Sequence, residues 1–167
     1  MESSSKKEHR LEWILLTVTL VLVFVIIGII SLFYRSSRPL AQAKEEATTM
    51  ARKYTDLQTV DDFYRFTREK TYFSLLGEDK KGTKIAVIMP KDGETIKVLK
   101  QKDGISENQA LQTAAQAYPK ERVIKADLGL FEDQPVWEVT SESADGGVNF
   151  VLLSYSDGKE VKKISNI

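Results

Sequence analysis

The chain has 167 residues, of which 24 are basic and 24 acidic, so its formal net charge at pH 7 is zero. This balance argues against nucleic acid as a partner, because proteins that bind phosphate backbones concentrate positive charge. The chain has no cysteine, which excludes disulfides, cysteine metal sites and thiol catalysis. Its one histidine is His9, in the N-terminal tail.

The first predicted element is a membrane helix at residues 13–34, which follows a short tail of residues 1–12. These 22 residues contain no charge, and 16 of them are Leu, Ile, Val or Phe. At about 1.5 Å per residue the helix is about 33 Å long, close to the apolar thickness of a bilayer. Trp13 at one end and Phe33 and Tyr34 at the other suit the two membrane interfaces.

A cleaved signal peptide is the alternative for this segment. Its apolar region normally spans about 7–15 residues, which is shorter than the one found here. A small-residue pattern that suits cleavage, Ala41-Gln42-Ala43, follows only after Arg35 and Arg38. The sequence therefore favours an uncleaved anchor.

Basic residues flank both ends of the predicted helix, so charge alone barely sets its orientation. Lys6, Lys7 and Arg10 precede it, and Arg35, Arg38 and Lys44 follow it. The short tail on one side and the long polar region on the other suit an anchor with a cytoplasmic N-terminus. We expect a single-pass cell-membrane protein with extracytoplasmic C-terminal domains.

The soluble part begins with a predicted helix that Ser37 caps and Pro39 opens. Apolar residues spaced by three and four give it one apolar face: Leu40, Ala43, Ala47, Met50 and Tyr54. Two heptads are too few to predict a coiled coil. Four strands separated by turn signals follow, at residues 60–67, 71–76, 83–89 and 95–99.

A second helix is predicted after Gly104. Ser106 and Gln109 have the spacing of a capping box, and Ile105 and Ala110 that of a hydrophobic staple. Its apolar stripe is Leu111, Ala114, Ala115 and Tyr118, and Pro119 ends it. Four more strands are predicted at residues 121–130, 135–141, 148–155 and 160–164.

The two sets of elements form a tandem repeat with a period of about 64 residues. Gly82 corresponds to Gly146 and Gly93 to Gly158, while residues 73–75 correspond to 137–139 and residues 85–88 to 149–152. The predicted fold class is α+β: each unit packs one helix on an antiparallel four-stranded sheet. Each unit is small, so we expect the two to share a core.

The sequence resembles a known family in both repeats. Residues 105–111, residues 136–140 and the Asp157-Gly158 turn resemble a PepSY domain. Tyr72, Phe73 and the turn at residues 79–82 resemble the TseB-like (YpmB-type) domain of cell wall elongation regulators. The predicted domains are therefore a TseB-like domain at residues 35–103 and a PepSY-like domain at residues 104–167.

This resemblance implies that both domains have a cystatin-like fold. It also implies an extracytoplasmic regulator or scaffold of cell wall elongation that acts by protein–protein contact, with a penicillin-binding transpeptidase as its partner. Two alternatives stay open: a PepSY-type inhibitor or modulator of an extracytoplasmic peptidase, and a module that binds peptidoglycan directly.

The residues themselves do not point to an enzyme, a cofactor or a metal. The region after the membrane helix has neither histidine nor cysteine, which excludes Ser-His and Cys-His catalysis. The acidic pairs at residues 61–62, 78–79 and 132–133 lie in predicted turns or at strand edges, where we interpret them as solvated. A glycosidase would need two carboxylates facing each other across a cleft.

Four residues are candidates for partner binding: Tyr72, Val87, Trp137 and Leu153. Each lies on a predicted strand whose sheet has more apolar residues than one helix covers. For Trp137 the favoured interpretation is core packing under the second helix. For Val87 and Leu153 the alternative is the interface between the two repeats. Lys80, Lys81 and Lys84 flank one turn and could meet anionic wall polymer or lipid, although a solvated surface is the simpler interpretation.

Overall fold

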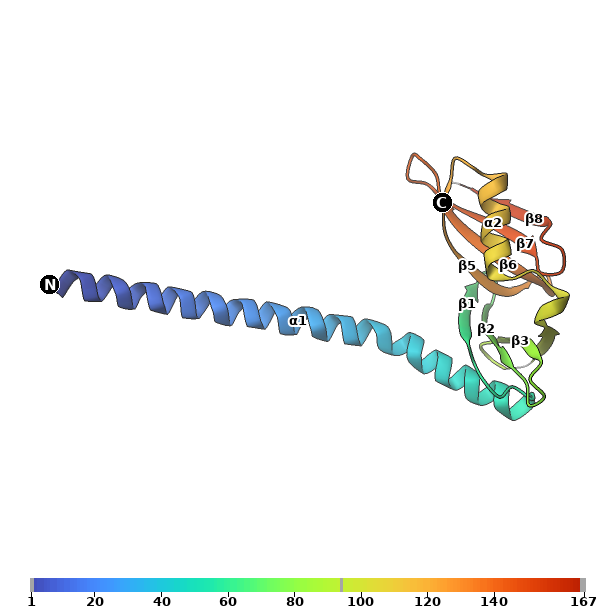
Figure 1. Ribbon diagram of the computed structural model, residues 1–167, viewed down its shortest axis with the longest axis horizontal. Coiled ribbons are helices and arrows are strands. Elements are labelled where there is room, and N and C mark those ends of the chain that lie inside the picture. Colours follow the sequence, from blue (N-terminus) through green and yellow to red (C-terminus); the bar gives the residue numbers. More distant parts are fainter. Residues whose placement is uncertain (1, 94, 166–167) are drawn as a thin grey trace. The chain divides into compact units, whose positions relative to one another are not determined.

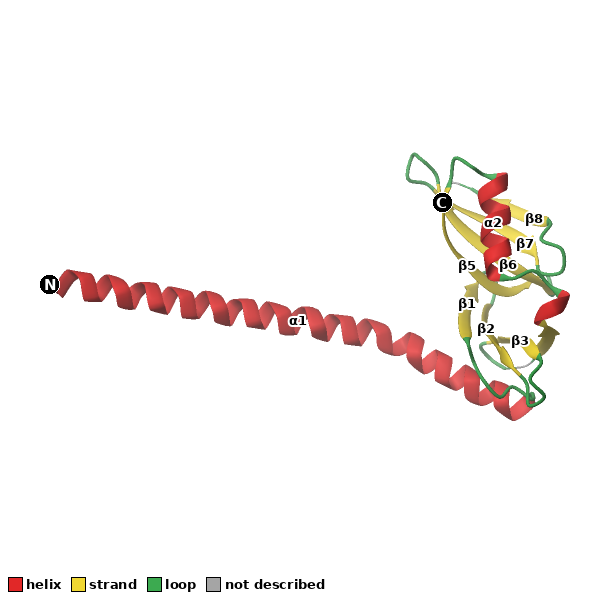
Figure 2. Ribbon diagram, in the orientation of Figure 1, coloured by secondary structure: helices red, strands yellow, loops and turns green. Residues whose placement is uncertain are grey.

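The computed structural model describes residues 2–93 and 95–165, with the side chains of residues 2–12 and 31–39 left out of the description. The chain divides into two compact units, Met1–Ala43 and Lys44–Ile167 (Figure 1). The first unit is helical, and the second contains all eight strands and the second helix (Figure 2).

Helix α1 (Glu2–Tyr54) contains the segment that is long and apolar enough to cross a membrane, Trp13–Ile30. Its apolar side chains are exposed, as expected of a helix that faces lipid. The Thr17 and Thr19 hydroxyls each donate a 2.8 Å hydrogen bond to the carbonyl four residues earlier. The polar groups of both threonines are thus satisfied within the helix.

The sequence predicted two helices, one ending at Tyr34 and one capped by Ser37, whereas the structure has the single helix α1. The separate start at Ser37 is therefore wrong. Residues 31–39 contain no glycine to end a helix, and a proline removes only one backbone donor. The predicted interfacial aromatics Phe33 and Tyr34, like the flanking charges at residues 6–10 and 35–38, lie outside the described side chains.

The first sheet consists of β1 (Asp62–Thr67), β2 (Thr71–Glu78), β3 (Lys84–Pro90) and β4 (Lys97–Lys100), paired in chain order and antiparallel. The end of α1 packs on it through Ala47 and Ala51, which are 3% and 0% exposed. Met50 of the same helix touches Gly93 in the turn after β3. Small side chains thus let helix and sheet approach closely.

The second sheet consists of β5 (Arg122–Phe131), β6 (Gln134–Glu142), β7 (Val148–Ser154) and β8 (Glu160–Ile164), again in chain order. Helix α2 (Glu107–Ala117) lies against it, with Ala110 and Ala114 buried (Figure 1). The predicted capping box is confirmed: the Ser106 hydroxyl accepts from the Gln109 backbone, and the Gln109 side chain accepts from the Ser106 N–H. The predicted stripe is wrong at Ala115, which is exposed.

The two repeats share one hydrophobic core, as predicted. A single cluster joins Tyr64, Ala86 and Ile88 of the first sheet to Trp137 and Leu153 of the second. The face of the first sheet covers the edge strand β5, with most contacts from β1. The Ser74 hydroxyl donates a buried 2.7 Å hydrogen bond to the Leu128 carbonyl on that edge, so a strand edge that would otherwise stay open is covered.

The repeat is visible in the turns as well as in the strand order. Gly82 and Gly146 precede the third strand of each sheet with φ of 76° and 86°. Gly93 and Gly158 precede the fourth strand with φ of 76° and 70°. A positive φ strains other residues, so glycine is favoured at all four positions. The domain boundary at residue 104 stays a prediction.

Candidate partner-binding surface

Trp137, the most prominent aromatic candidate, is fully buried. Its indole N–H donates a 3.0 Å hydrogen bond to the Ile105 carbonyl just before α2. The Tyr64 ring meets it edge-on, with centroids 5.2 Å apart. The structure therefore assigns Trp137 a packing role that ties the first sheet, the second sheet and the start of α2 together.

Two of the other candidates are also buried, with Val87 0% and Leu153 2% exposed. Tyr72 is half-buried and packs where the two sheets meet, its ring centroid 6.2 Å from that of Phe66. The structure does not gather the four candidates on one surface. Among them, Tyr72 keeps exposed area for a partner, and a partner-binding role stays a prediction.

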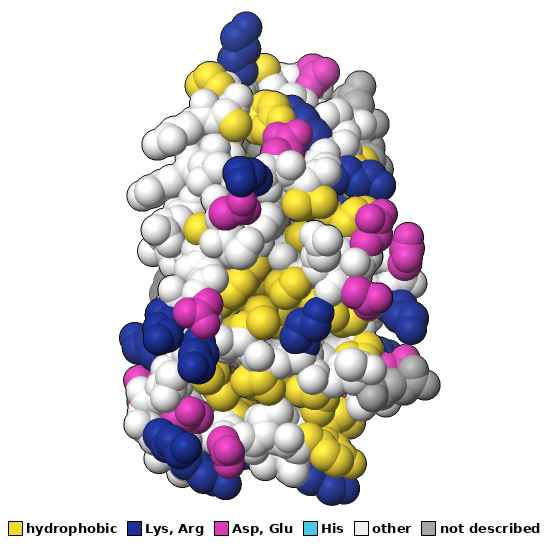
Figure 3. Space-filling view, turned by 90° about the vertical axis from the view of Figure 1, so that its right-hand side faces the viewer, with side chains coloured by type: hydrophobic (Ala, Val, Ile, Leu, Met, Phe, Trp, Pro, Cys, Tyr) yellow, Lys and Arg dark blue, Asp and Glu magenta, His cyan; other side chains and the backbone are white. Residues whose placement is uncertain are grey.

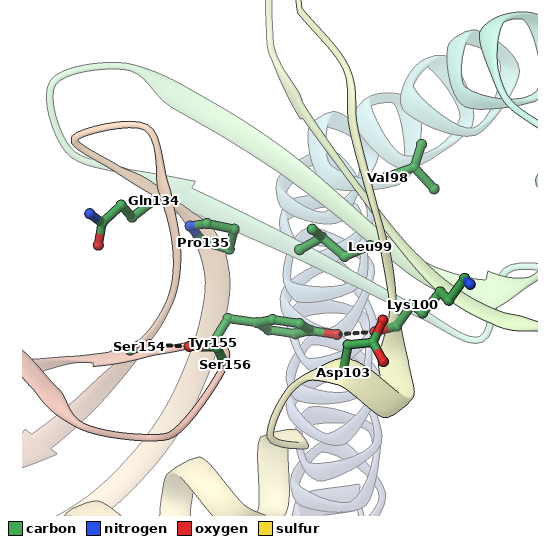
Figure 4. A pocket seen from close by; sticks show the side chains of 9 residues that line it. All are labelled: Val98, Leu99, Lys100, Asp103, Gln134, Pro135, Ser154, Tyr155 and Ser156. Carbon is green, nitrogen blue, oxygen red and sulfur yellow. Dashed lines mark hydrogen bonds between the residues drawn. The ribbon is translucent and has the colours of Figure 1, made fainter.

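A groove lies where the two repeats meet, which we call the junction groove (Figure 4). It has a volume of about 520 Å³, within the range of ligand-binding clefts. Its walls come from β4, the following 3₁₀ turn, the start of β6 and the end of β7: Val98, Leu99, Lys100, Asp103, Gln134, Pro135, Ser154, Tyr155 and Ser156.

Tyr155 is buried in this groove between the two repeats. Its hydroxyl donates to the Lys100 carbonyl at 3.3 Å, while its backbone N–H donates to the Pro135 carbonyl at 3.0 Å. Gly104 lies against the ring, since a Cβ there would come within 2.1 Å of it. Burial, and secondarily the charge of Asp103, raise the pKa of Tyr155, so the hydroxyl stays a hydrogen-bond donor at neutral pH.

Apolar and basic side chains border the junction groove together. Val98 is 48% exposed, which is unusual for a valine beside a core. Lys100 and Lys102 are exposed nearby, and the Lys97 amino group donates to the Asp133 carbonyl at 2.6 Å. Figure 3 shows hydrophobic side chains gathered over the middle of one face of the molecule, with Lys and Arg around them.

A partly buried ion pair joins the two repeats without lining the junction groove. The Arg68 guanidinium donates to the Glu138 carboxylate and covers the Phe150 ring at 4.4 Å. Burial raises the pKa of Glu138 despite this partner. Because the pair joins the β1–β2 turn to β6, we interpret it as a clamp between the repeats rather than a catalytic acid.

Of the acidic pairs, Asp79, Glu132 and Asp133 have structural roles in turns, whereas Asp62 lies in β1 and Glu78 in β2. Asp79 accepts 2.8 Å hydrogen bonds from the backbone of Lys81 and Thr83, and the Thr83 bond is the main cause of its lowered pKa. Glu132 and Asp133 form the β5–β6 turn with φ of 48° and 60°. Among the described residues, no group of three or more His, Cys, Asp or Glu could hold a metal ion.

Within residues 44–167, the spacing Ser-x-x-Lys, which penicillin-recognising enzymes use, occurs at Ser156 and Lys159. Both lie in the turn between β7 and β8. Asp157 pairs with Lys159 at 2.8 Å and raises the pKa of its amino group. The Lys159 and Asp157 side chains are both exposed, so we interpret their pairing as a contact within the turn.

The lysines near the first turn are surface residues. Lys80, Lys81 and Lys84 are exposed, and Lys80 pairs with Asp56 at 3.1 Å. An exposed ion pair of this kind contributes little to stability. Contact of these lysines with anionic polymer or lipid stays a prediction.

Two family matches cover most of the globular unit. The cell wall elongation regulator TseB-like domain matches residues 46–90, and the peptidase propeptide and YPEB domain, PepSY, matches residues 104–163. The fold, the tandem repeat and these matches together define a protein with an N-terminal apolar helix and two repeats, the first TseB-like and the second PepSY-like. The chain belongs to the TseB-like family of cell wall elongation regulators.

Relatives from Bacillus subtilis align with nearly their whole length. The probable cell wall elongation regulator TseB of strain 168 is 28% identical over 159 residues, which cover 93% of this chain and 99% of the relative. The solved structure of the YpmB protein is 30% identical, with a TM-score of 0.65, and the match covers 72% of this chain and 95% of that one.

Proposed function

We propose that this protein is a membrane-anchored, extracytoplasmic regulator or scaffold of cell wall elongation that acts by protein–protein contact, with a penicillin-binding transpeptidase as its partner. The observation that carries the proposal is the match to the probable regulator TseB over 93% of this chain. A non-catalytic role agrees with it, because Asp79, Glu132 and Asp133 have structural roles in turns.

The proposed orientation keeps the N-terminus in the cytoplasm and places Lys44–Ile167 outside. The chain has no cysteine, so a single introduced cysteine is a specific label site. In intact cells, a membrane-impermeant maleimide should label Ala144→Cys, in an exposed turn, and spare Ser4→Cys in the tail. The reverse labelling pattern would overturn the orientation.

In-cell photo-crosslinking tests the proposed partner. A photoreactive amino acid is placed at Gln134, which is exposed at the junction groove, and at the half-buried Tyr72. Ala144 is the control, since it lies at the opposite end of β6 from Gln134. We expect a crosslinked product that binds a fluorescent penicillin and that mass spectrometry identifies as a transpeptidase. The absence of such a product at every probe position would refute this partner.

A second candidate function is inhibition or modulation of an extracytoplasmic peptidase, which the PepSY match at residues 104–163 favours. Here the crosslinked product would be a peptidase, and the purified chain would slow its turnover. Direct binding of peptidoglycan is the third possibility. Retention of the purified chain on intact sacculi, without any protein crosslink, would support it over the other two.

A further inference from the structure

Strand β4 (Lys97–Lys100) is an edge of the first sheet with one side open. Among the strands that the structure describes, only β3 pairs with it, in a regular register from Ile85↔Lys100 to Ile88↔Lys97. The two edges of the second sheet differ from β4. The β5 ladder has a register shift at residues 123–125 and is covered by the first sheet, and the β8 ladder has one at residues 152–153. Such bulges blunt an edge, whereas β4 stays straight.

The backbone groups on the open side of β4 can be assigned. The Lys100 carbonyl points away from β3, because it accepts from the Tyr155 hydroxyl at 3.3 Å. In a strand the backbone groups of alternate residues point to the same side. The N–H and carbonyl of Val98 therefore also point outward, and neither has a hydrogen-bond partner among the described residues, so both are available to an added strand.

The junction groove runs along this open edge. Leu99 and Lys100 of β4 lie on one side of it and Pro135 and Tyr155 on the other, while the Val98 side chain, at the rim, points away from Tyr155 (Figure 4). Val98, 48% exposed, adds an apolar contact beside the free backbone groups. The edge thus combines unpaired backbone with a cleft for side chains, which together recognise extended peptides.

The charge along β4 indicates which peptide fits. Residues 97–103 contain three lysines, Lys97, Lys100 and Lys102, and one acidic residue, Asp103. Two copies of β4 brought edge to edge would place lysines against lysines, which disfavours a second copy of this chain. An acidic segment would meet opposite charge, which steers association.

We infer that β4 and the junction groove bind an extended, acidic segment of the protein partner as an added strand of the first sheet. This inference rests on the proposed function in taking the partner to be a protein. It adds the binding face, the backbone mode and the chemistry of the bound segment.

The test compares two substitutions at one residue in the full-length, membrane-inserted protein. Val98→Pro removes the outward N–H but no hydrogen bond to β3, so the sheet is preserved. Val98→Ala keeps the N–H and removes most of the side chain. With the photoreactive probe at Gln134, we expect Val98→Pro to lower the yield of crosslinked partner at least tenfold and Val98→Ala to lower it less than threefold. Equal thermal unfolding midpoints of the two variants serve as the folding control.

Each outcome bears on the inference separately from the proposed function. Equal yields for Val98→Pro, Val98→Ala and the unsubstituted chain would overturn the added strand, even if the captured protein is a transpeptidase. A loss of crosslink yield in Val98→Pro alone, with the captured protein identified as a peptidase, would support the added strand. It would refute a transpeptidase as the partner. No protein crosslink at Gln134 would overturn the binding face, and a transpeptidase captured at another probe would still uphold the proposed function.

A charge reversal tests the chemistry of the segment. We expect Lys100→Glu to lower the crosslink yield at least threefold, with the loss reduced at high salt, where electrostatic attraction is screened. Lys120→Glu is the matched control, because Lys120 is exposed in the turn after α2 and does not line the groove. Equal yields for the two reversals would overturn the acidic segment.

Discussion

Phe66 of the first sheet contacts Gly129 of the second, so substitutions at these two positions measure how much the packing between the repeats contributes to stability. Phe66 is fully buried with Val136 and Leu152, and a Cβ at Gly129 would lie 2.2 Å from the Phe66 ring. Phe66→Ala should lower the free energy of unfolding by about 3–5 kcal/mol, since it removes a buried ring and leaves a cavity. Gly129→Ala should lower it by about 1–3 kcal/mol, because the methyl group collides with the ring.

The double variant tests whether the two effects share one cause. In Phe66→Ala the ring is gone, so the methyl group at Gly129 finds space. We expect the double variant to be about 0.5–3 kcal/mol more stable than the sum of the single effects predicts. Phe66→Leu, a smaller change, replaces Phe66→Ala in the cycle if the alanine variant does not fold, because total stabilities are only about 5–15 kcal/mol.

The assay is urea unfolding of the full chain in detergent micelles, followed by tryptophan fluorescence. The chain has two tryptophans, so Trp13→Phe leaves Trp137 as the single fluorophore. Trp137 is buried and packs on Tyr64 of the first sheet, so its emission reports the loss of the shared core. Strict additivity of the two substitutions would refute the packing of β1 on β5 described above.

Three further predictions concern single side chains. Ser74→Ala removes the buried hydrogen bond to the Leu128 carbonyl and should cost about 1–3 kcal/mol in the same urea assay; an unchanged midpoint would contradict its role at the sheet edge. A hydrogen bond to Glu160 raises the pKa of Tyr118 to about 12, so its stabilising effect is complete below pH 10.0 and lost as the pH rises through about 12. Ultraviolet titration should show one high-pH tyrosine fewer in Tyr118→Phe, and identical curves would refute the assignment. Hydrogen bonds within its turn, first of all that with the Lys159 side chain, lower the pKa of Asp157 to about 2. The stabilising effect of the Asp157 carboxylate is therefore complete above pH 3.8 and lost as the pH falls through about 2. The thermal midpoint of Asp157→Asn should depend less on pH in this range than that of the unsubstituted chain, and an equal pH dependence of the two midpoints would contradict the assignment.

The docking of the repeats also bears on the proposed binding face. The junction groove takes its walls from both repeats, so it exists only while the sheets hold their relative position. Phe66→Ala lies outside the groove, and it should lower crosslinking at Gln134 only to the extent that its loss of about 3–5 kcal/mol unfolds the chain. Val98→Pro should lower crosslinking without loss of stability.

The sequence by itself determined the local structure of this protein. The uncharged run at residues 13–34 predicted the apolar helix, and the Ser106 capping box placed the start of α2. The turn glycines and alternating strands predicted two four-stranded sheets in chain order. These features depend on residues close together in the chain, whose spacing dictates their conformation.

Only the tertiary structure decided which apolar residues are buried and which surface stays open. Trp137 and Leu153 belong to the core cluster that joins the two sheets. Val87 lies in a continuous apolar run, on the opposite face of β3 from Ala86 and Ile88, and is buried as well. The sequence does not show what covers each of these side chains. The covered edge at β5 and the open edge at β4 read alike in sequence, because a strand does not show which of its sides has a neighbour. That difference arises from contacts between residues far apart in the chain, such as Ser74 with Leu128.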